Sequence, residues 1–340
     1  MNFTSDNAAG MSPEILAALS AANAGSAASY GDDAITKRVE AKLAEIFEHE
    51  VAAFPVATGT IANALALATT VPPWGVVYCH REAHIVVDEC GAPEFYAGGA
   101  RMHGLEGAHG KLVPAALAPL LPGGKGEVHH MQPAALSLTQ ATEAGTVYTA
   151  AETAALAELA HAHGLAVHVD GARFANALVH LGGAPADITW RAGVDVLSFG
   201  ATKNGAAAAE AVIFFDPAKA GDFAYRRKRG GHLFSKMRFL SAQLDAYLAG
   251  DLWLRNARHA NRMAARLADG LRSMPGARLR HPVEANEIFV ELPDATVEHL
   301  HAKGFQFHRW DATAIRLVTA FDTKAEDVDA FIATARAPQK

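Results

Sequence analysis

Three consecutive segments between residues 134 and 169 constrain the fold more than any other part of the sequence, because they follow the pattern strand, helix, strand. In chain order they are Ala134–Leu138, Ala151–His163 and Leu165–Val169. Thr149 precedes the helix with Glu152 three residues on, which is the capping-box pattern, and Gly164 stands where a left-handed C-cap is needed. Two strands joined by a helix in this way pair in parallel within one sheet.

Further apolar runs extend this pattern. Val194–Phe199 and Ala211–Phe215 each end in Gly, Asp or Pro and are predicted to be buried strands. Alanine-rich helical stretches separate such runs through most of the chain. The alternation predicts an α/β fold with a large, mainly parallel sheet.

The pattern changes at about residue 249, where the sequence predicts a smaller α+β domain. Its expected elements are a helix over Leu254–Leu271, strands over Glu287–Leu292 and Ile315–Thr319, and a final helix over Glu326–Ala335. The first residues are predicted to form an extended arm and a helix capped by Ser12, with Pro13 at its first position. We therefore divide the chain into an N-terminal arm and helix (1–25), a large domain (26–248) and a small C-terminal domain (249–340).

The composition excludes several classes of protein. Half of the 340 residues are hydrophobic, so the chain can bury a large core and is neither disordered nor fibrous. The net charge of −6 lacks the basic excess of nucleic-acid-binding proteins, and no nucleic-acid partner is expected. The short basic run Arg226–Arg229 is interpreted either as a solvated face or as an anion site.

Cysteine usage and hydropathy bear on where the protein works. Cys79 and Cys90 are too few for a disulfide framework and lack the spacing partners of a zinc site, so reduced thiols are expected. Apolar runs are broken before membrane-spanning length, and the N-terminal residues carry no charged-then-apolar leader. No metal-binding pattern such as His-Glu-x-x-His occurs. We expect a soluble cytoplasmic protein with no membrane partner and no metal.

An acid and a lysine follow two successive predicted strands. Asp170 ends the strand Leu165–Val169, and Lys203 follows the strand Val194–Phe199 among small residues. Functional side chains in open α/β sheets lie beyond the carboxyl ends of strands. Pyridoxal phosphate (PLP) needs a carboxylate facing its pyridine nitrogen and a lysine whose amine forms a Schiff base. Alone, Asp170 is as readily a turn or cap residue and Lys203 a surface residue, but the pair favours a PLP site.

Other segments supply candidate contacts for such a cofactor. The turn Thr58-Gly59-Thr60 opens an alanine-rich helix, and backbone N–H groups at a helix N-terminus with threonine hydroxyls form a phosphate cradle. Among the 17 histidines, His84 and His129 are singled out as a ring-stacking group and a proton acceptor near a substrate hydroxyl. Their spacing alone assigns neither role.

Taken together and in this order, a set of motifs resembles the L-threonine aldolases, low-specificity type, within the aspartate-aminotransferase-like (fold type I) PLP-dependent enzymes. The motifs are Phe3–Asn7, Tyr30–Asp33, Thr58–Asn63, Ala83-His84, His168–Arg173, Lys203 and Ile315–Thr319. The resemblance spans almost the whole chain. It implies a fold type I architecture and PLP as the cofactor.

The resemblance also implies roles for individual residues. For the cofactor, these are Lys203 as the Schiff-base lysine, Asp170 at the pyridine nitrogen, Thr58, Gly59 and Thr60 at the phosphate, and His84 on the ring. For the substrate, Ser5, Arg173 and Arg316 form the carboxylate group, with Arg173 also near the cofactor, and His129 contacts the β-hydroxyl. A guanidinium suits a carboxylate because it donates two parallel hydrogen bonds.

The chain also departs from the family pattern. After Lys203, Asn204-Gly205 and then Ala206–Ala209 stand where many relatives have a Gly-Leu-Gly-type segment, which predicts a differently shaped loop. The family's phosphate-binding arginine is unmatched, and Arg229 or Lys236 is proposed to replace it. Together these departures predict a divergent branch that acts on aryl substrates such as phenylserine. The resemblance further implies a homodimer or homotetramer, with Tyr30 and the segment 226–236 as candidates for crossing into a neighbouring site.

The predicted reaction is reversible cleavage of an L-β-hydroxy-α-amino acid, such as threonine or allo-threonine, to glycine and an aldehyde. His129, or a water that it holds, is the candidate base, with His84 as the rival. An aminotransferase or a β-eliminating lyase is the alternative, because the cofactor contacts would be the same. A second alternative is a non-catalytic protein that binds PLP or a nicotinamide cofactor. Nicotinamide binding is disfavoured because no Gly-x-Gly-x-x-Gly follows a strand.

Overall fold

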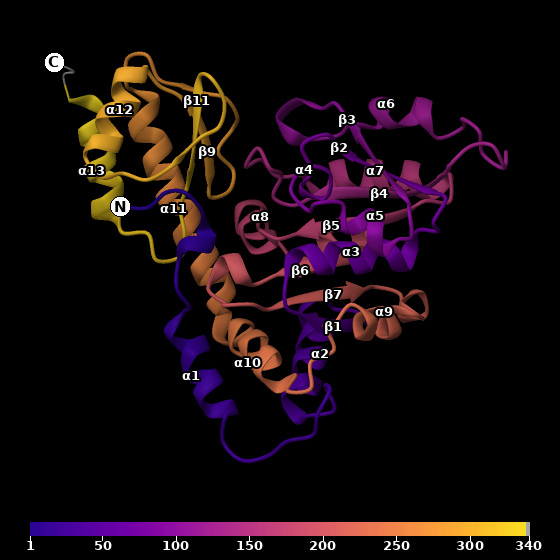
Figure 1. Cartoon of the computed structure of the whole chain (residues 1–340). Helices are drawn as coiled ribbons and strands as arrows, with labels where there is room; N and C mark the ends of the chain where they lie inside the picture. The colour runs from indigo at the N-terminus through magenta and orange to yellow at the C-terminus, as the bar shows by residue number, and fades with distance from the viewer. Residues whose placement is uncertain (338–340) are drawn as a thin grey trace.

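The structure, a computed structural model of the chain, describes residues 1–337 and is built around two β-sheets (Figure 1). The larger sheet has seven strands in the order β1-β7-β6-β5-β4-β2-β3. They are β1 (Ala52–Val56), β2 (Gly75–His80), β3 (Arg101–Leu105), β4 (Gln132–Thr139), β5 (Ala166–Gly171), β6 (Val196–Gly200) and β7 (Glu210–Phe214). Among these seven strands β7 alone runs opposite to the direction of the other six. The predicted mainly parallel α/β sheet is confirmed.

Helices cover both faces of this sheet. They are α2 (Ala34–Ile46), α3 (Gly59–Thr70), α4 (His84–Val87), α5 (Ala92–Tyr96), α6 (Pro114–Leu117), α7 (Ala150–Ala162), α8 (Phe174–Leu181), α9 (Phe223–Arg229) and α10 (Arg238–Tyr247). Along β7, Ile213 packs into a core with α2, α7, α8 and α10, whereas Phe214 packs into a core with α3 and α9. A strand buried on both faces has no polar side to show, and its sequence is therefore a continuous apolar run.

The strand, helix, strand unit predicted from the sequence is present as β4, α7 and β5. Thr149 caps α7 and forms the capping box with Glu152, and Gly164 adopts φ +79°, so both predicted caps are confirmed. The predicted boundaries shift by one or two residues, as when β6 begins at Val196 and not at Val194. Such shifts are expected because helix and strand ends are the least determined part of a pattern.

The last quarter of the chain forms a four-stranded antiparallel sheet with helices, drawn orange to yellow in Figure 1. Its elements are α11 (Leu252–Arg272), β8 (Arg278–Leu279), β9 (Glu287–Glu291), α12 (Asp294–Ala302), β10 (His308–Arg309), β11 (Ala314–Val318) and α13 (Ala325–Arg336). The strand order is β10-β11-β9-β8, which confirms a smaller α+β part. Helix α11 contributes to the cores of both parts of the molecule. Its Trp253 packs into the core of the large sheet, and its Leu267 packs into the core of the four-stranded sheet. The exact domain limits therefore stay a prediction.

The N-terminal arm leads into helix α1 (Pro13–Ala22) with Pro13 at its first position, as predicted. Ser12 stands at the N-cap but makes no side-chain cap hydrogen bond. Its hydroxyl instead accepts a hydrogen bond of 2.9 Å from the Asn256 amide, which lies in α11. The predicted N-cap position of Ser12 is therefore confirmed, but its hydroxyl contacts α11 and not the first turn of α1. Within residues 1–337 no helix combines the length and apolar character needed to span a bilayer.

Candidate active site

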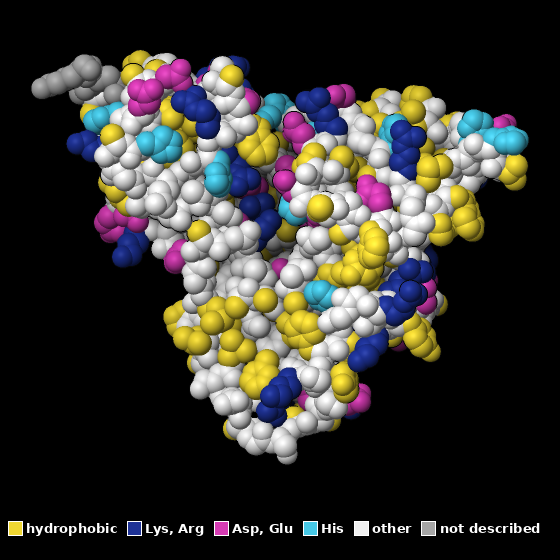
Figure 2. Space-filling model, viewed as in Figure 1, with side chains coloured by type: hydrophobic (Ala, Val, Ile, Leu, Met, Phe, Trp, Pro, Cys, Tyr) yellow, Lys and Arg dark blue, Asp and Glu magenta, His cyan; other side chains and the backbone are white. Residues whose placement is uncertain are grey.

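A cavity of about 740 Å³ opens where the carboxyl ends of β4, β5 and β6 meet the N-terminus of α3 and the four-stranded sheet. In the space-filling view, acidic, basic and histidine side chains gather in the hollow between the two parts of the molecule (Figure 2). Many of its lining residues are ones that the sequence singled out. These are Ser5, Thr58, Gly59, Thr60, His84, Asp170, Arg173, Lys203 and Arg316. The cavity therefore gathers residues from opposite ends of the chain.

Two glycines allow the exits of β5 and β6 to lie close together. A Cβ atom on Gly171 would lie 2.7 Å from the Ser198 carbonyl oxygen, and one on Gly200 would lie 2.6 Å from the Ala172 carbonyl oxygen. Real Cβ atoms do not approach backbone atoms so closely. Glycine at both exits thus brings the loop that carries Lys203 against the end of the strand that carries Asp170.

The loop that carries Lys203 is held at several points. Lys203 lies in a short 3₁₀ helix, Thr202–Asn204, directly after β6. The Asn204 amide donates to the Tyr247 hydroxyl and to the Trp253 carbonyl, each at 2.8 Å. Gln243 Oε1 accepts from the backbone N–H groups of the alanine segment that follows, those of Ala207 and Ala208. The segment that departs from the family pattern is therefore an ordered wall of the cavity.

Glu210 is a lining residue that sequence reasoning missed. It begins β7 and faces Gly200 of β6 and Val56 of β1 in the register of the sheet. Its Oε2 accepts the Ala201 N–H at 2.8 Å, at the start of the Lys203 loop. Burial raises the pKa of Glu210 to about 7, against the opposing effects of the Thr202 hydroxyl and the Lys203 ammonium. A carboxyl group that titrates near neutrality thus lies beside the candidate lysine.

Asp170 ends β5 and is 5% exposed. Its Oδ1 accepts the Ala172 N–H at 3.0 Å, and its Oδ2 accepts the Asn63 amide at 2.8 Å. The same Asn63 nitrogen also donates to Glu89 Oε1 at 2.9 Å. Asn63 therefore links the acid on β5 to a second buried carboxylate, and it too was missed as a separate site residue.

His84 begins α4 and contacts two acids. Its ring Nδ1 lies 2.8 Å from Glu89 Oε1, and its backbone N–H donates to Glu143 Oε1 at 2.8 Å. The hydrogen bond to Glu89 raises the pKa of His84, and this effect is larger than the opposing effect of burial. Burial raises the pKa of Glu143 to about 7, and the nearby Asp170 charge adds to this. His84 thus lies beside two carboxyl groups, Glu89 and Glu143, whose pKa values are raised by burial.

Arg173 follows β5 and is bound by two carboxylates. Its Nε and NH2 donate to the two oxygens of Asp6 at 2.7 and 3.0 Å, and its NH1 lies 3.0 Å from Glu287 Oε2. Arg316, on β11, has NH1 4.0 Å from Glu287 Oε1 and donates through NH2 to the Thr4 carbonyl at 3.2 Å. The two predicted carboxylate-binding arginines are therefore neighbours and share Glu287.

Helix α3 presents its N-terminus to the cavity. Thr58 is the N-cap, and its hydroxyl accepts the Ile61 N–H at 3.3 Å. The N–H groups of Gly59 and Thr60, in the first turn, have no partner within the helix. A Cβ at Gly59 would meet nothing within 4 Å, so the backbone there is open to an approaching group. Such a terminus fits a phosphate.

These observations fit the family that the comparisons identify. A family model described as beta-eliminating lyase matches residues 2–295. A low specificity L-threonine aldolase of Pseudomonas aeruginosa is 43% identical over 327 residues, covering 96% of this chain and 94% of that protein. The chain belongs to the low-specificity L-threonine aldolase family. A second relative of the same description, from Pseudomonas sp., is 41% identical and covers 98% of this chain and 97% of that protein.

A solved structure shows the same relationship in three dimensions. The threonine aldolase of Leishmania major has a TM-score of 0.92 to this aldolase-family chain at 28% sequence identity, with 98% of each chain covered. The fold type I assignment made from the sequence is confirmed.

Four predicted residues of this family member do not line the cavity within the described chain. His129 is exposed in a turn just before β4, whereas the cavity lies at the other end of that strand, about 25 Å away at the usual rise per residue. The structure does not bring His129 to the site, and the predicted contact with the β-hydroxyl is not supported within one chain. Tyr30, Arg229 and Lys236 are exposed as well. Their predicted crossing into a neighbouring site stays a prediction.

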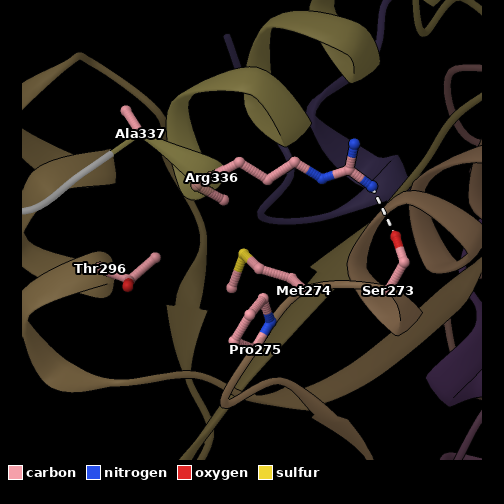
Figure 3. Close-up of a pocket in the computed structure, with 7 residues that line it drawn as sticks. Ser273, Met274, Pro275, Thr296, Arg336 and Ala337 are labelled. Carbon is pink, nitrogen blue, oxygen red and sulfur yellow. Dashed lines mark hydrogen bonds between the residues drawn. The ribbon is translucent and has the colours of Figure 1, made fainter.

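A second hollow, near the C-terminus, carries no comparable chemistry (Figure 3). It has a volume of about 450 Å³ and is lined by Ser273, Met274, Pro275, Thr296, Ala335, Arg336 and Ala337. The Arg336 NH2 group donates to the Ser273 hydroxyl at 2.6 Å and to the Gly270 carbonyl at 2.7 Å. The Arg336 guanidinium is thus engaged in local contacts, and the first cavity remains the candidate active site.

Proposed function

We propose that the chain is a PLP-dependent aldolase that cleaves L-threonine, L-allo-threonine and related L-β-hydroxy-α-amino acids, phenylserine included, to glycine and an aldehyde. The observation that carries the proposal is the meeting of Lys203, Asp170 and the Arg173–Arg316 pair in one cavity of a chain 43% identical to a named threonine aldolase. Trp310, which also lines the cavity, offers the aromatic surface that supports including an aryl substrate.

The residues of the cavity fit PLP. Lys203 would bind the cofactor's aldehyde carbon, Asp170 its pyridine nitrogen, and the first turn of α3 its phosphate. Asn63 donates a hydrogen bond to one oxygen of Asp170 and so fixes the orientation of the carboxyl group that the pyridine nitrogen needs. Bound there, PLP supplies an electron sink for the bond that breaks at the substrate's α-carbon.

The side chains around the substrate orient it and move its protons. Arg173 and Arg316 hold the carboxylate, and this fixes which bond at the α-carbon is aligned to break. With Nδ1 donating to Glu89, the His84 ring leaves Nε2 as the atom that accepts the β-hydroxyl proton. Glu143, which accepts a hydrogen bond from the His84 backbone N–H, is a second group that can hold a proton. His84 therefore takes the role for which His129 and His84 were rivals.

The experiment that tests the proposal compares purified wild-type protein, Lys203→Ala and a control, Lys219→Ala, whose lysine pairs with Asp195 outside the cavity. Wild type and Lys219→Ala are expected to show cofactor absorbance near the edge of the visible range that borohydride abolishes, and Lys203→Ala to show no such lysine-linked band. Aldehyde release is then assayed with threonine, allo-threonine and phenylserine. If the wild-type protein lacks this absorbance band, the cofactor assignment is wrong. If the band is present but no aldehyde is released, only the aldolase assignment is wrong.

We also infer from the family resemblance a cytoplasmic homodimer or homotetramer. Tyr30, Arg229 and Lys236 are exposed and outside their own chain's cavity, and this supports a place for them at a neighbour's site, where Arg229 or Lys236 would reach the phosphate. Light scattering during gel filtration measures the assembly. A monomer that retains full activity would contradict this arrangement.

A further inference from the structure

Arg173 has no free edge for a substrate carboxylate. Asp6 takes its Nε and NH2, and Glu287 lies against its NH1 at 3.0 Å. Arg316 meets the same Glu287 from the other side, at 4.0 Å. Two guanidinium groups therefore face two carboxylates of the chain itself, and their charges are already balanced.

The two carboxylates are not equally well bound. Asp6 makes two hydrogen bonds to Arg173 and accepts a third from the Asn286 amide at 3.0 Å. Glu287, 2% exposed on β9, has an Oε2 that makes no well-oriented hydrogen bond within the described residues, although Arg173 is near. The Nε atom of Arg316 also has no hydrogen-bond partner among residues 1–337. Glu287 is therefore the member of the group that another carboxylate can replace at least cost.

We propose that Glu287 competes with the substrate's carboxylate for Arg173 and Arg316, and that it takes up a proton from solvent when the substrate is bound. The proposal rests on the proposed function, because that function places the substrate's carboxylate on these arginines. The step balances: Glu287 gains one proton, the buffer loses one, and the two guanidinium groups keep two carboxylates. Without it, three carboxylates would share two cations in a buried cavity, which costs more than the pairing returns.

The surroundings of Glu287 support proton uptake. The charged groups that face it are Arg173 after β5, Asp6 in the arm, Arg316 on β11, Lys203 after β6 and Glu143 after β4. Burial, and then the Asp6 charge against the opposing effect of Arg173, raises the pKa of Glu287 above its ordinary value. Below that pKa the protonated carboxyl leaves the arginines free. Above it, binding must draw a proton from solvent, and affinity falls as pH rises.

The test uses glycolate, which carries the carboxylate of glycine but no amine, so that exchange at the cofactor does not enter the proton count. Its dissociation constant for the PLP-loaded enzyme is measured by calorimetry in two buffers of different ionisation enthalpy, from about pH 6 to about pH 9. Wild type is expected to weaken by up to about tenfold per pH unit above the Glu287 midpoint and to take up about one proton per glycolate. Glu287→Gln is expected to bind more tightly at high pH, with a flat profile and no such uptake.

Glu291→Gln is the matched control, since Glu291 lies at the other end of β9 and pairs with Arg278 and Arg280 outside the cavity. It should behave as wild type. If Glu287→Gln binds glycolate more weakly at every pH with unchanged proton uptake, Glu287 merely supports Arg173 and the proposal is overturned. Should the variant not fold, a flat wild-type profile overturns it equally. An enzyme that binds glycolate with the Glu287-dependent profile yet releases no aldehyde contradicts the proposed function and leaves this inference standing.

Discussion

At the scale of single residues, the cavity is set apart by buried acids from distant parts of the chain. Glu89, Glu143, Glu210 and Glu287 all line it. A buried carboxyl group is costly unless it is paired or keeps its proton, so several at one cavity mark a place where protons are exchanged. None could be singled out from the sequence, because each stands in an ordinary loop or strand and gains its meaning only from residues that the fold brings beside it.

The first prediction concerns Glu210. Above about pH 7 Glu210 carries a negative charge that interacts with the Lys203 nitrogen, and it also accepts the Ala201 N–H. Glu210→Gln keeps an acceptor for that N–H but removes the charge. We expect the pH midpoint of the bound cofactor's absorbance to move to lower pH, with a fall in kcat, measured by spectral titration and initial rates.

Asp195→Asn is a suitable control for this prediction. Asp195 is also a carboxylate that accepts a backbone N–H, that of Val167, but it precedes β6 and so lies at the other end of that strand from Lys203. Its titration should match that of wild type. A Glu210→Gln enzyme with an unmoved midpoint would show that Glu210 only shapes the loop.

The second prediction concerns stability and Glu143, whose pKa rises from an ordinary 4.5 to about 7 on folding, chiefly through burial. Such an acid keeps its proton longer in the folded chain than in the unfolded chain, so its contribution to stability falls as pH rises between those two values. We expect Glu143→Gln to have little effect near pH 4.5 and to stabilise the protein at higher pH, by about 3 kcal/mol at most. Urea unfolding at a series of pH values measures this, and parallel curves for the two proteins would refute it.

At the scale of elements, local patterns predicted what local forces determine. The capping box of α7 and the left-handed Gly164 were found because each depends on residues within one turn of the helix end. The strands β2 and β3 were not identified. The apolar run of β2 is short and has no flanking caps, so it does not distinguish strand from helix, and β3, with the sequence Arg-Met-His-Gly-Leu, has no apolar run at all. Ser12 was correctly placed at the N-cap of α1, but the contact of its hydroxyl with Asn256, from far along the chain, follows no local pattern.

The third prediction tests the capping box. Thr149→Ala removes the hydroxyl that accepts the Glu152 N–H at 3.2 Å, and the reciprocal bond from the Thr149 N–H to Glu152 at 2.7 Å loses its fixed geometry. We expect a loss of about 1 kcal/mol in the free energy of unfolding. Thr149→Ser should retain most of it. Because α7 lies away from the cavity lining, cofactor content and KM should not change, and a change in either would mean that α7 influences the site.

At the scale of the whole molecule, the N-terminal arm joins the two sheets to the cavity. The sequence predicted an arm and a helix over residues 1–25 without indicating what they pack against, and Phe3 is buried at 1% exposure in the core of the smaller sheet. Its backbone donates to the Gln306 carbonyl at 2.8 Å and accepts from the Val318 N–H at 2.9 Å. The arm was recognisable only as a motif, because its partners lie some 300 residues away in the chain and no local pattern records them.

The last prediction follows from this arrangement. The Phe3 ring packs against the rings of Phe305 and Phe331, at centroid distances of 6.5 and 5.4 Å. Phe3 therefore anchors the arm that, three residues later, places Asp6 against Arg173. Phe3→Ala leaves a cavity in the smaller core and should cost about 3–5 kcal/mol in the free energy of unfolding. Since the arm then loses its anchor, Asp6 holds Arg173 less firmly, and we expect KM for threonine to rise more than kcat falls, because ground-state and transition-state binding of the carboxylate weaken together.

Denaturant unfolding and steady-state kinetics measure the two effects separately on the same preparation. Phe95→Ala, at a ring that is 78% exposed on α5, is the matched control and should change neither. Asp6→Asn isolates the second half of the argument, because it keeps the arm's core anchor and removes only the charge facing Arg173. If Phe3→Ala lowers stability but leaves KM at the wild-type value while Asp6→Asn raises it, the arm is held at the cavity by Asp6 itself, and the smaller core does not position the substrate's arginine.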